Sequence, residues 1–92
     1  MTLYDVLNNW LQLKIVADLR PDDEAAQVSL EHVADILDKE HQVKIVSVNK
    51  KEDQYEVIYT EKEIENKQSF PARVAEILLQ FIKENPERYE FN

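Results

Sequence analysis

The segment from Pro21 to His41, PDDEAAQVSLEHVADILDKEH, concentrates the residue types that could carry chemistry. It holds seven carboxylates and both histidines of the chain. Side chains of these types bind metals, act as general acids and bases, attract basic partners, or only solvate the surface of a helix. Their spacing decides which of these uses the segment can support.

A metal site is the first use to consider, because His32 and Asp35 lie three residues apart. Two histidine ligands on one helical face are normally three or four residues apart, whereas His32 and His41 are nine apart. A catalytic carboxylate needs burial or a close like charge, and the acids fall mostly on predicted polar faces. No serine or threonine has an evident activating base. We therefore predict no metal, no cofactor, no catalytic residue and no enzymatic activity.

A docking surface is the second use, because one side of the predicted helix is acidic. At about 100° per residue, the inward side is formed by Ala26, Leu30, Val33, Ala34 and Leu37. The opposite side carries Gln27 and five residues that we call the acidic stripe: Glu24, Val28, Glu31, Asp35 and Asp38. Glu31 and Asp35 form a like-charge i, i+4 pair, which costs a helix about 0.2 to 0.5 kcal/mol. Helix stability alone would not select that pair.

The acidic stripe contains one apolar residue, Val28, among carboxylates. An apolar anchor inside a polar rim is typical of a docking surface, although a solvated helix face with one incidental valine has the same composition. The chain has 19 acidic and 11 basic residues and a formal charge of -8, which repels nucleic acid and anionic membranes. The leading prediction is a small non-catalytic protein-interaction or regulatory domain that docks a basic protein partner through the acidic stripe.

Two other functions stay open. A small-molecule-binding or enzymatic domain would have a pocket between the sheet and the helices, lined by Trp10, Tyr55 and Tyr59. An acidic mimic of nucleic acid would need a broad negative surface, against which the distributed basic residues, including Lys50 and Lys51, argue. Direct nucleic-acid binding through these lysines is disfavoured by the neighbouring carboxylates.

Two missing residue types narrow the possibilities further. The chain has no glycine, which disfavours phosphate-cradling loops, dinucleotide-binding turns and the nucleophile elbow of serine hydrolases. Without glycine, we expect any positive φ at Asn49, Asp53 and Asn66. The chain also has no cysteine, as is common in a reducing compartment, and its first residues, MTLYDVLNNW, do not resemble a signal peptide. We therefore expect a cytoplasmic protein.

The elements that must position these side chains follow from hydrophobic periodicity. Residues 2–20 predict one helix capped by Thr2, although LQLKI within it alternates like a short strand. Leu11, Ile15 and Leu19 lie outside the main apolar face of this helix. They predict either a homodimer contact through these three residues or a helix packed between the other two helices.

The rest of the chain predicts a helix, a sheet and a helix. Pro21 opens a helix that extends to about His41. The period then changes to two in a hairpin, with Val43 and Ile45 on one face and Lys44 and Val46 on the other. A third strand is expected over residues 66–70.

A last helix is expected from Pro71 to about Glu84, with an inward face formed by Val74, Ile77, Leu78, Phe81 and Ile82. In the segment after it, we expect Tyr89 and Phe91 to pack back onto the sheet. Residues 1–92 therefore predict one acidic α+β domain: two N-terminal helices, a two- or three-stranded antiparallel sheet, and a C-terminal helix packed on one face of the sheet.

Overall fold

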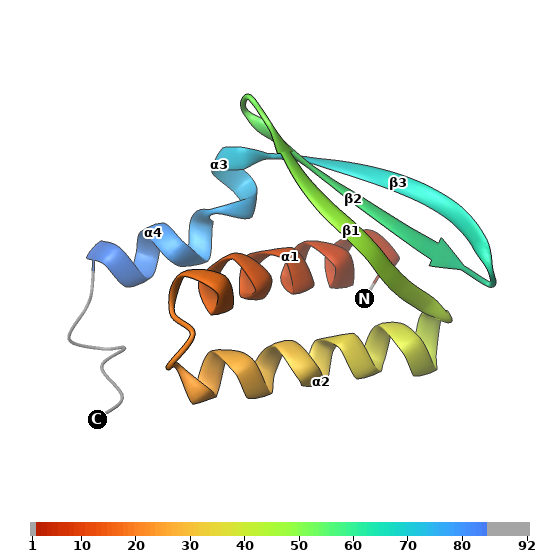
Figure 1. The fold of residues 1–92 in the computed structure, drawn as a ribbon, viewed down its shortest axis with the longest axis horizontal. Coiled ribbons are helices and arrows are strands. Elements are labelled where there is room, and N and C mark those ends of the chain that lie inside the picture. The colour runs from red at the N-terminus through yellow and green to blue at the C-terminus, as the bar shows by residue number, and fades with distance from the viewer. Residues whose placement is uncertain (1, 85–92) are drawn as a thin grey trace.

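A three-stranded antiparallel sheet with helices on one face forms the fold (Figure 1). The structure is a computed structural model that describes residues 2–84. Along the chain the elements are α1 (Leu3–Leu19), α2 (Glu24–His41), β1 (Val43–Lys51), β2 (Gln54–Glu61), β3 (Ile64–Pro71), α3 (Ala72–Ala75) and α4 (Ile77–Glu84). The predicted α+β class and the third strand are confirmed. None of the helices in this part of the chain is both long enough and apolar enough to cross a membrane.

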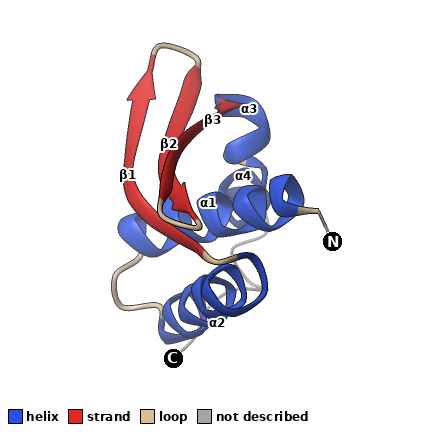
Figure 2. Cartoon of the chain, turned by 90° about the vertical axis from the view of Figure 1, so that its right-hand side faces the viewer, coloured by secondary structure: helices blue, strands red, loops and turns tan. Residues whose placement is uncertain are grey.

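Helix α1 is continuous, so the strand-like alternation in LQLKI is overridden by helix formation. Its first turn is capped by Thr2, whose Oγ1 accepts a hydrogen bond from the Asp5 amide at 3.2 Å. The helix lies between α2 on one side and the sheet with α3 and α4 on the other (Figures 1 and 2). Leu11 is 0% exposed and Ile15 is buried with it, whereas Leu19 is 62% exposed. Leu11 is therefore not available to the predicted homodimer contact, because the chain itself covers this side chain.

Strand β1 contains a bulge at Val46, where the register with β2 shifts between Ile45 and Ser47. Before the bulge, Val43 and Ile45 share one face of the strand, as predicted, and this face is toward the helices. The extra residue reverses the alternation, because a bulge places two residues opposite one on the partner strand. Val48 consequently packs against the core, while Val46 is 57% exposed.

The two hairpin turns and the end of α2 contain the residues with positive φ. The register leaves two residues in each turn, Glu52 with Asp53 and Lys62 with Glu63. Positive φ occurs at Gln42 (56°), Glu52 (51°), Lys62 (52°) and Glu63 (70°). The expectation of positive φ at Asn49, Asp53 and Asn66 is wrong, because strand register rather than residue preference sets which residues form the turns.

Relieving the strain in the second turn should stabilise the protein. Two consecutive non-glycine residues with positive φ, Lys62 and Glu63, fit the type I′ turn that favours Asn-Gly. We expect Lys62→Asn with Glu63→Gly to raise the free energy of unfolding by about 1 kcal/mol, measured by urea denaturation. The same pair placed at Glu65 and Asn66, inside β3, should destabilise the sheet. No gain from the turn variant would contradict the φ values of this turn.

The C-terminal helical segment is broken at Glu76, between α3 and α4. Ala75, Leu79 and Ile82 are the buried residues of these two helices. Ile77 is 55% exposed and Phe81 is exposed as well. The predicted inward positions of Ile77 and Phe81 are therefore wrong, because the break turns α4 relative to a continuous helix. Tyr89 and Phe91, which were predicted to pack back onto the sheet, lie outside the described residues.

Candidate protein-interaction surface

The start of α2 is fixed by Asp23, which is only 7% exposed. Its Oδ1 accepts a hydrogen bond from the Ala26 amide at 3.0 Å, and its Oδ2 lies 3.2 Å from Nε of Arg20. The Asp23 amide donates to the Arg20 carbonyl at 3.0 Å. The helix consequently begins at Glu24. The predicted start at Pro21 is wrong, because this turn and the Asp23 cap precede the first helical residue.

The inward side of α2 packs on α1 and on the start of β1. Ala26 and Leu37 are buried, and Leu30 and Val33 are half-buried against the core. Ala34 is exposed and does not belong to this side, which corrects its predicted position. A side chain at position 34 lies about 60° from that of Leu37 around the helix, beyond the edge of the contact with α1.

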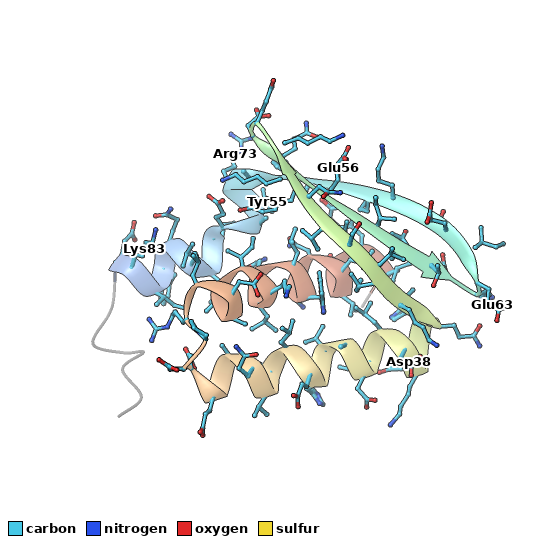
Figure 3. The ribbon with its side chains drawn as sticks, viewed as in Figure 1. Asp38, Tyr55, Glu56, Glu63, Arg73 and Lys83 are labelled. Atoms are coloured by element: carbon cyan, nitrogen blue, oxygen red, sulfur yellow. The ribbon has the colours of Figure 1, made fainter. Side chains whose placement is uncertain are left out.

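The structure brings the five residues of the acidic stripe together on the outer side of α2. All five are exposed, and Val28 is 64% exposed. At about 100° per residue they fall within an arc of about 80° that is opposite the buried side. Figure 3 shows side chains along α2 that point away from α1, with Asp38 at the end of the helix next to the start of β1. The predicted placement of these five residues on the water-facing half of one helix agrees with the structure. Gln27, which was predicted on the same half, is half-buried and donates a hydrogen bond from Nε2 to the Ala17 carbonyl at 3.2 Å, because it lies at the edge next to α1.

The carboxylates of the acidic stripe are mostly without a counter-charge. Helix α2 carries five carboxylates and one lysine, Lys39. Lys39 Nζ lies 3.2 Å from Oδ2 of Asp35. Within residues 2–84, Glu24, Glu31 and Asp38 have no ion pair. The negative charge of this surface is therefore available to an external cation.

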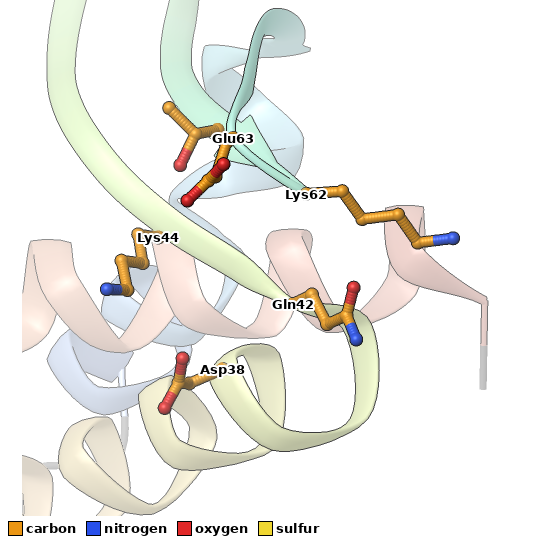
Figure 4. Close-up of a pocket in the computed structure, with 6 residues that line it drawn as sticks. Asp38, Gln42, Lys44, Lys62 and Glu63 are labelled. Atoms are coloured by element: carbon orange, nitrogen blue, oxygen red, sulfur yellow. The ribbon is translucent and has the colours of Figure 1, made fainter.

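At its C-terminal end the stripe adjoins a polar pocket of about 430 Å³. The pocket is lined by Asp38, Gln42, Lys44, Thr60, Lys62 and Glu63. In Figure 4 the Lys44 side chain lies between those of Asp38 and Glu63, whereas Lys62 points away from them. The amide of Lys62 donates to the Gln42 carbonyl at 3.0 Å, which ties the β2–β3 turn to the end of α2. The acidic surface therefore ends at Lys44, whose side chain is positively charged.

The two histidines of α2 lie in different surroundings. His32 is exposed, and His41 is half-buried in the last turn of the helix. No group of three or more histidine, cysteine, aspartate or glutamate side chains within residues 2–84 is arranged to hold a metal ion. His41 lies at the C-terminal end of α2, where a positive charge would interact favourably with the helix dipole.

The aromatic residues proposed to line a pocket are only partly brought together. Trp10 and Tyr55 both line a groove of about 490 Å³ between α1 and β1, which we call the α1–β1 groove. Tyr59 is buried in the core and does not line it. The groove therefore has one aromatic residue from α1 and one from β2.

A polar cluster that the sequence analysis missed joins the sheet to the α3–α4 break. Oε2 of Glu76 accepts a hydrogen bond from the Tyr55 hydroxyl at 2.6 Å and lies 3.2 Å from Nζ of Lys50. The Tyr55 hydrogen bond, with help from Lys50, lowers the pKa of Glu76. The bond to Glu76 raises the pKa of Lys50, and burial followed by the nearby carboxylate raises the pKa of Tyr55. The cluster holds three elements together.

Two residues of this cluster could have been predicted from the sequence through the register of the hairpin. Lys50 and Tyr55 are cross-strand neighbours flanking the Glu52–Asp53 turn, and a two-residue hairpin would place them together. Glu76 is 21 residues beyond Tyr55 and approaches only through the packing of α3.

Comparison of the chain with protein-family models, with curated proteins and with solved structures finds no match.

Proposed function

We propose that the protein is a small non-catalytic interaction or regulatory domain, and that it docks a basic protein partner through the acidic stripe. One observation supports this most strongly: Val28 is exposed among carboxylates of which Glu24, Glu31 and Asp38 have no ion pair within residues 2–84. A basic partner would supply the missing counter-charges and cover the valine.

The energetics of α2 also support a docking role. Glu31 and Asp35 are both exposed and lie one helical turn apart. Lys39 forms an ion pair with Asp35, whereas Glu31 has no ion pair within residues 2–84. Like charges at this spacing weaken a helix, and an exposed i, i+4 ion pair recovers only about 0.3 to 0.5 kcal/mol. The stripe therefore adds negative charge that the fold does not need for its own stability. A partner that uses this charge accounts for its position.

The proposal is tested by reversing the charge at the centre of the stripe. With the tagged protein as bait and native cell lysate as the source of partners, Glu31→Lys with Asp35→Lys should reduce recovery of a specific partner about tenfold. The reason is that two attractive contacts become repulsive across the same surface. Recovery is measured by quantitative mass spectrometry at low and at physiological salt. The interaction of the unaltered protein should weaken as salt rises, because its charge contacts are exposed.

A matched control separates the stripe from net charge. Glu65→Lys with Glu84→Lys makes the same change in charge at exposed positions of β3 and α4. This variant should retain the partner. Val28→Ser should also weaken the complex, although no charge is altered. Equal recovery with the stripe variant and with the control would contradict docking through α2.

A further inference from the structure

Strand β1 is an edge of the sheet, since the strand order is β1-β2-β3 (Figure 2). No backbone hydrogen bond from another segment of residues 2–84 reaches β1 apart from its pairing with β2. The outward-pointing amides and carbonyls of this nine-residue strand are therefore available to an incoming chain. An extended peptide can add to such an edge and gain main-chain hydrogen bonds.

The α1–β1 groove runs beside this edge on the helix side of the sheet. Its apolar lining comes from Ile45 and Val48 of β1, which are half-buried, and from the small exposed parts of Trp10 (7%) and Ile15 (8%) of α1. An added strand would direct alternate side chains toward this face, because neighbouring residues of a strand point to opposite sides. The groove thus favours a segment with an apolar residue at every second position.

The charges of β1 itself are opposite in sign to the net charge of the chain. β1 contains three lysines and no carboxylate, in a chain of net charge -8. Lys44 has no ion pair within the described residues, and Lys51 contacts Glu56 across the hairpin at 3.1 Å while remaining 66% exposed. Lys44 precedes the bulge and Lys51 follows it, and the alternation of side chains in each part of β1 places both lysines on the outer face of the sheet. Carboxylates on the outer side of an added strand would meet them.

We propose that the edge of β1 and the α1–β1 groove bind an extended peptide in which apolar and acidic residues alternate. The peptide adds as a fourth strand, with apolar side chains over Trp10 and Ile15 and carboxylates beside Lys44 and Lys51. This site adjoins the acidic stripe only at Lys44, which lines the same pocket as Asp38. It takes a partner of opposite charge to the partner of the stripe.

Protection of the edge explains only some of these features. Lysines and bulges on edge strands keep them from pairing with other chains. An apolar groove beside the edge adds nothing to that protection, because it offers an incoming strand a place for its side chains. The groove is therefore the feature that distinguishes recognition of a peptide from protection alone.

The test uses synthetic peptides and the natural fluorescence of the protein. Trp10 is the only tryptophan of the chain, and it lines the groove. The peptide EVEVEVE, blocked at both ends, should produce a saturable change in Trp10 fluorescence. It should also shift amide resonances of β1 and of the facing side of α1. KVKVKVK, with reversed charge, and EEEVVVE, with the same composition but no alternation, should bind at least about tenfold more weakly.

Two lysines provide a matched pair of variants. Lys51 on β1 and Lys67 on β3 contact the same Glu56 carboxylate, at 3.1 and 3.5 Å, and are 66% and 57% exposed. Lys51→Glu should weaken binding of EVEVEVE about fivefold, whereas Lys67→Glu should leave it within about twofold. Lys44→Glu, which breaks no ion pair of the described residues, should weaken binding to a similar extent as Lys51→Glu. Glu31→Lys with Asp35→Lys should retain it, so the two proposed surfaces fail independently.

Several outcomes would overturn the proposal. These are the absence of saturable binding, equal affinity for the three peptides, resonance shifts on β3 in place of β1, and equal losses from Lys51→Glu and Lys67→Glu. Equal affinity for octanoate, a small apolar carboxylate, would also overturn it, since the strand edge would then contribute nothing.

Discussion

Replacing Leu11 by alanine is expected to lower the free energy of unfolding by about 3 kcal/mol. Leu11 is 0% exposed and is enclosed by the sheet above α1 and the helices around it. Truncating a buried leucine removes its transfer free energy and leaves a cavity, which together cost about 2 to 5 kcal/mol. A domain of this size is stable by only about 5 to 15 kcal/mol, so the loss is a large part of the total. Urea denaturation followed by circular dichroism measures it.

Leu19→Ala is the matched control, since it makes the same chemical change on the same helix. Leu19 is 62% exposed, so its truncation should change stability by no more than about 0.5 kcal/mol. A Leu11→Ala effect as small as that of Leu19→Ala would contradict the burial of α1. Sedimentation of both variants shows in addition whether either residue influences self-association. Since Leu11 is buried, only Leu19 of these two residues can contribute to it.

The contrast between Leu11 and Leu19 shows where hydrophobic periodicity stops being informative. The period predicts that residues 2–20 form a helix, and that helix is present from Leu3 to Leu19. Its apolar residues spread around the cylinder because α1 is covered on several sides. Sequence alone cannot separate a helix buried by its own chain from one buried by a second copy, since both need the same surplus of apolar residues.

The sheet shows how a single inserted residue changes what alternation predicts. Alternation correctly places Val43 and Ile45 on the same face, but it does not say which face is toward the helices, and it gives no stable assignment for Val46 and Val48. The bulge at Val46 resolves this by reversing the parity of the strand. A bulge is set by pairing between strands, so it is not visible in the composition of β1 itself.

The C-terminal helices fail to match the sequence for a similar reason. Apolar spacing from Pro71 to Glu84 predicts one helix, yet Glu76 interrupts it and is bound to Tyr55 and Lys50 of the sheet. The break thus coincides with a contact between two residues that are 21 positions apart, Tyr55 and Glu76. Local periodicity contains no information about such a contact, so Ile77 and Phe81 were placed on the wrong side.

The position of the acidic stripe could be predicted from the sequence more fully than the packing of the core. The acidic stripe depends on the spacing of residues within one helix, which local sequence determines well. The α1–β1 groove depends on how β1 lies beside α1, and therefore on tertiary packing. Sequence reasoning selected Trp10 and Tyr55 from this region by residue type, and included Tyr59, which the core buries.

Replacing Asp23 by alanine is expected to lower the free energy of unfolding by about 2 kcal/mol. The carboxylate caps α2 through the Ala26 amide and also binds Nε of Arg20, while it is almost completely buried. Loss of an N-cap costs about 0.5 to 2 kcal/mol, and a buried amide left without its acceptor adds to that cost. Guanidinium denaturation at neutral pH measures the change.

Asp22→Ala is the matched control for the cap, because Asp22 is the preceding residue and is exposed. It removes the same charge but no capping bond, and should change stability by no more than about 0.5 kcal/mol. Asp23→Asn should fall between the two, because an asparagine side chain still accepts from the Ala26 amide but carries no charge for Arg20. If Asp22→Ala and Asp23→Ala destabilise equally, net charge rather than the cap fixes the start of α2. The acidic stripe would then begin on a frayed helix, and Glu24 and Val28 would not be held on one surface with Asp35.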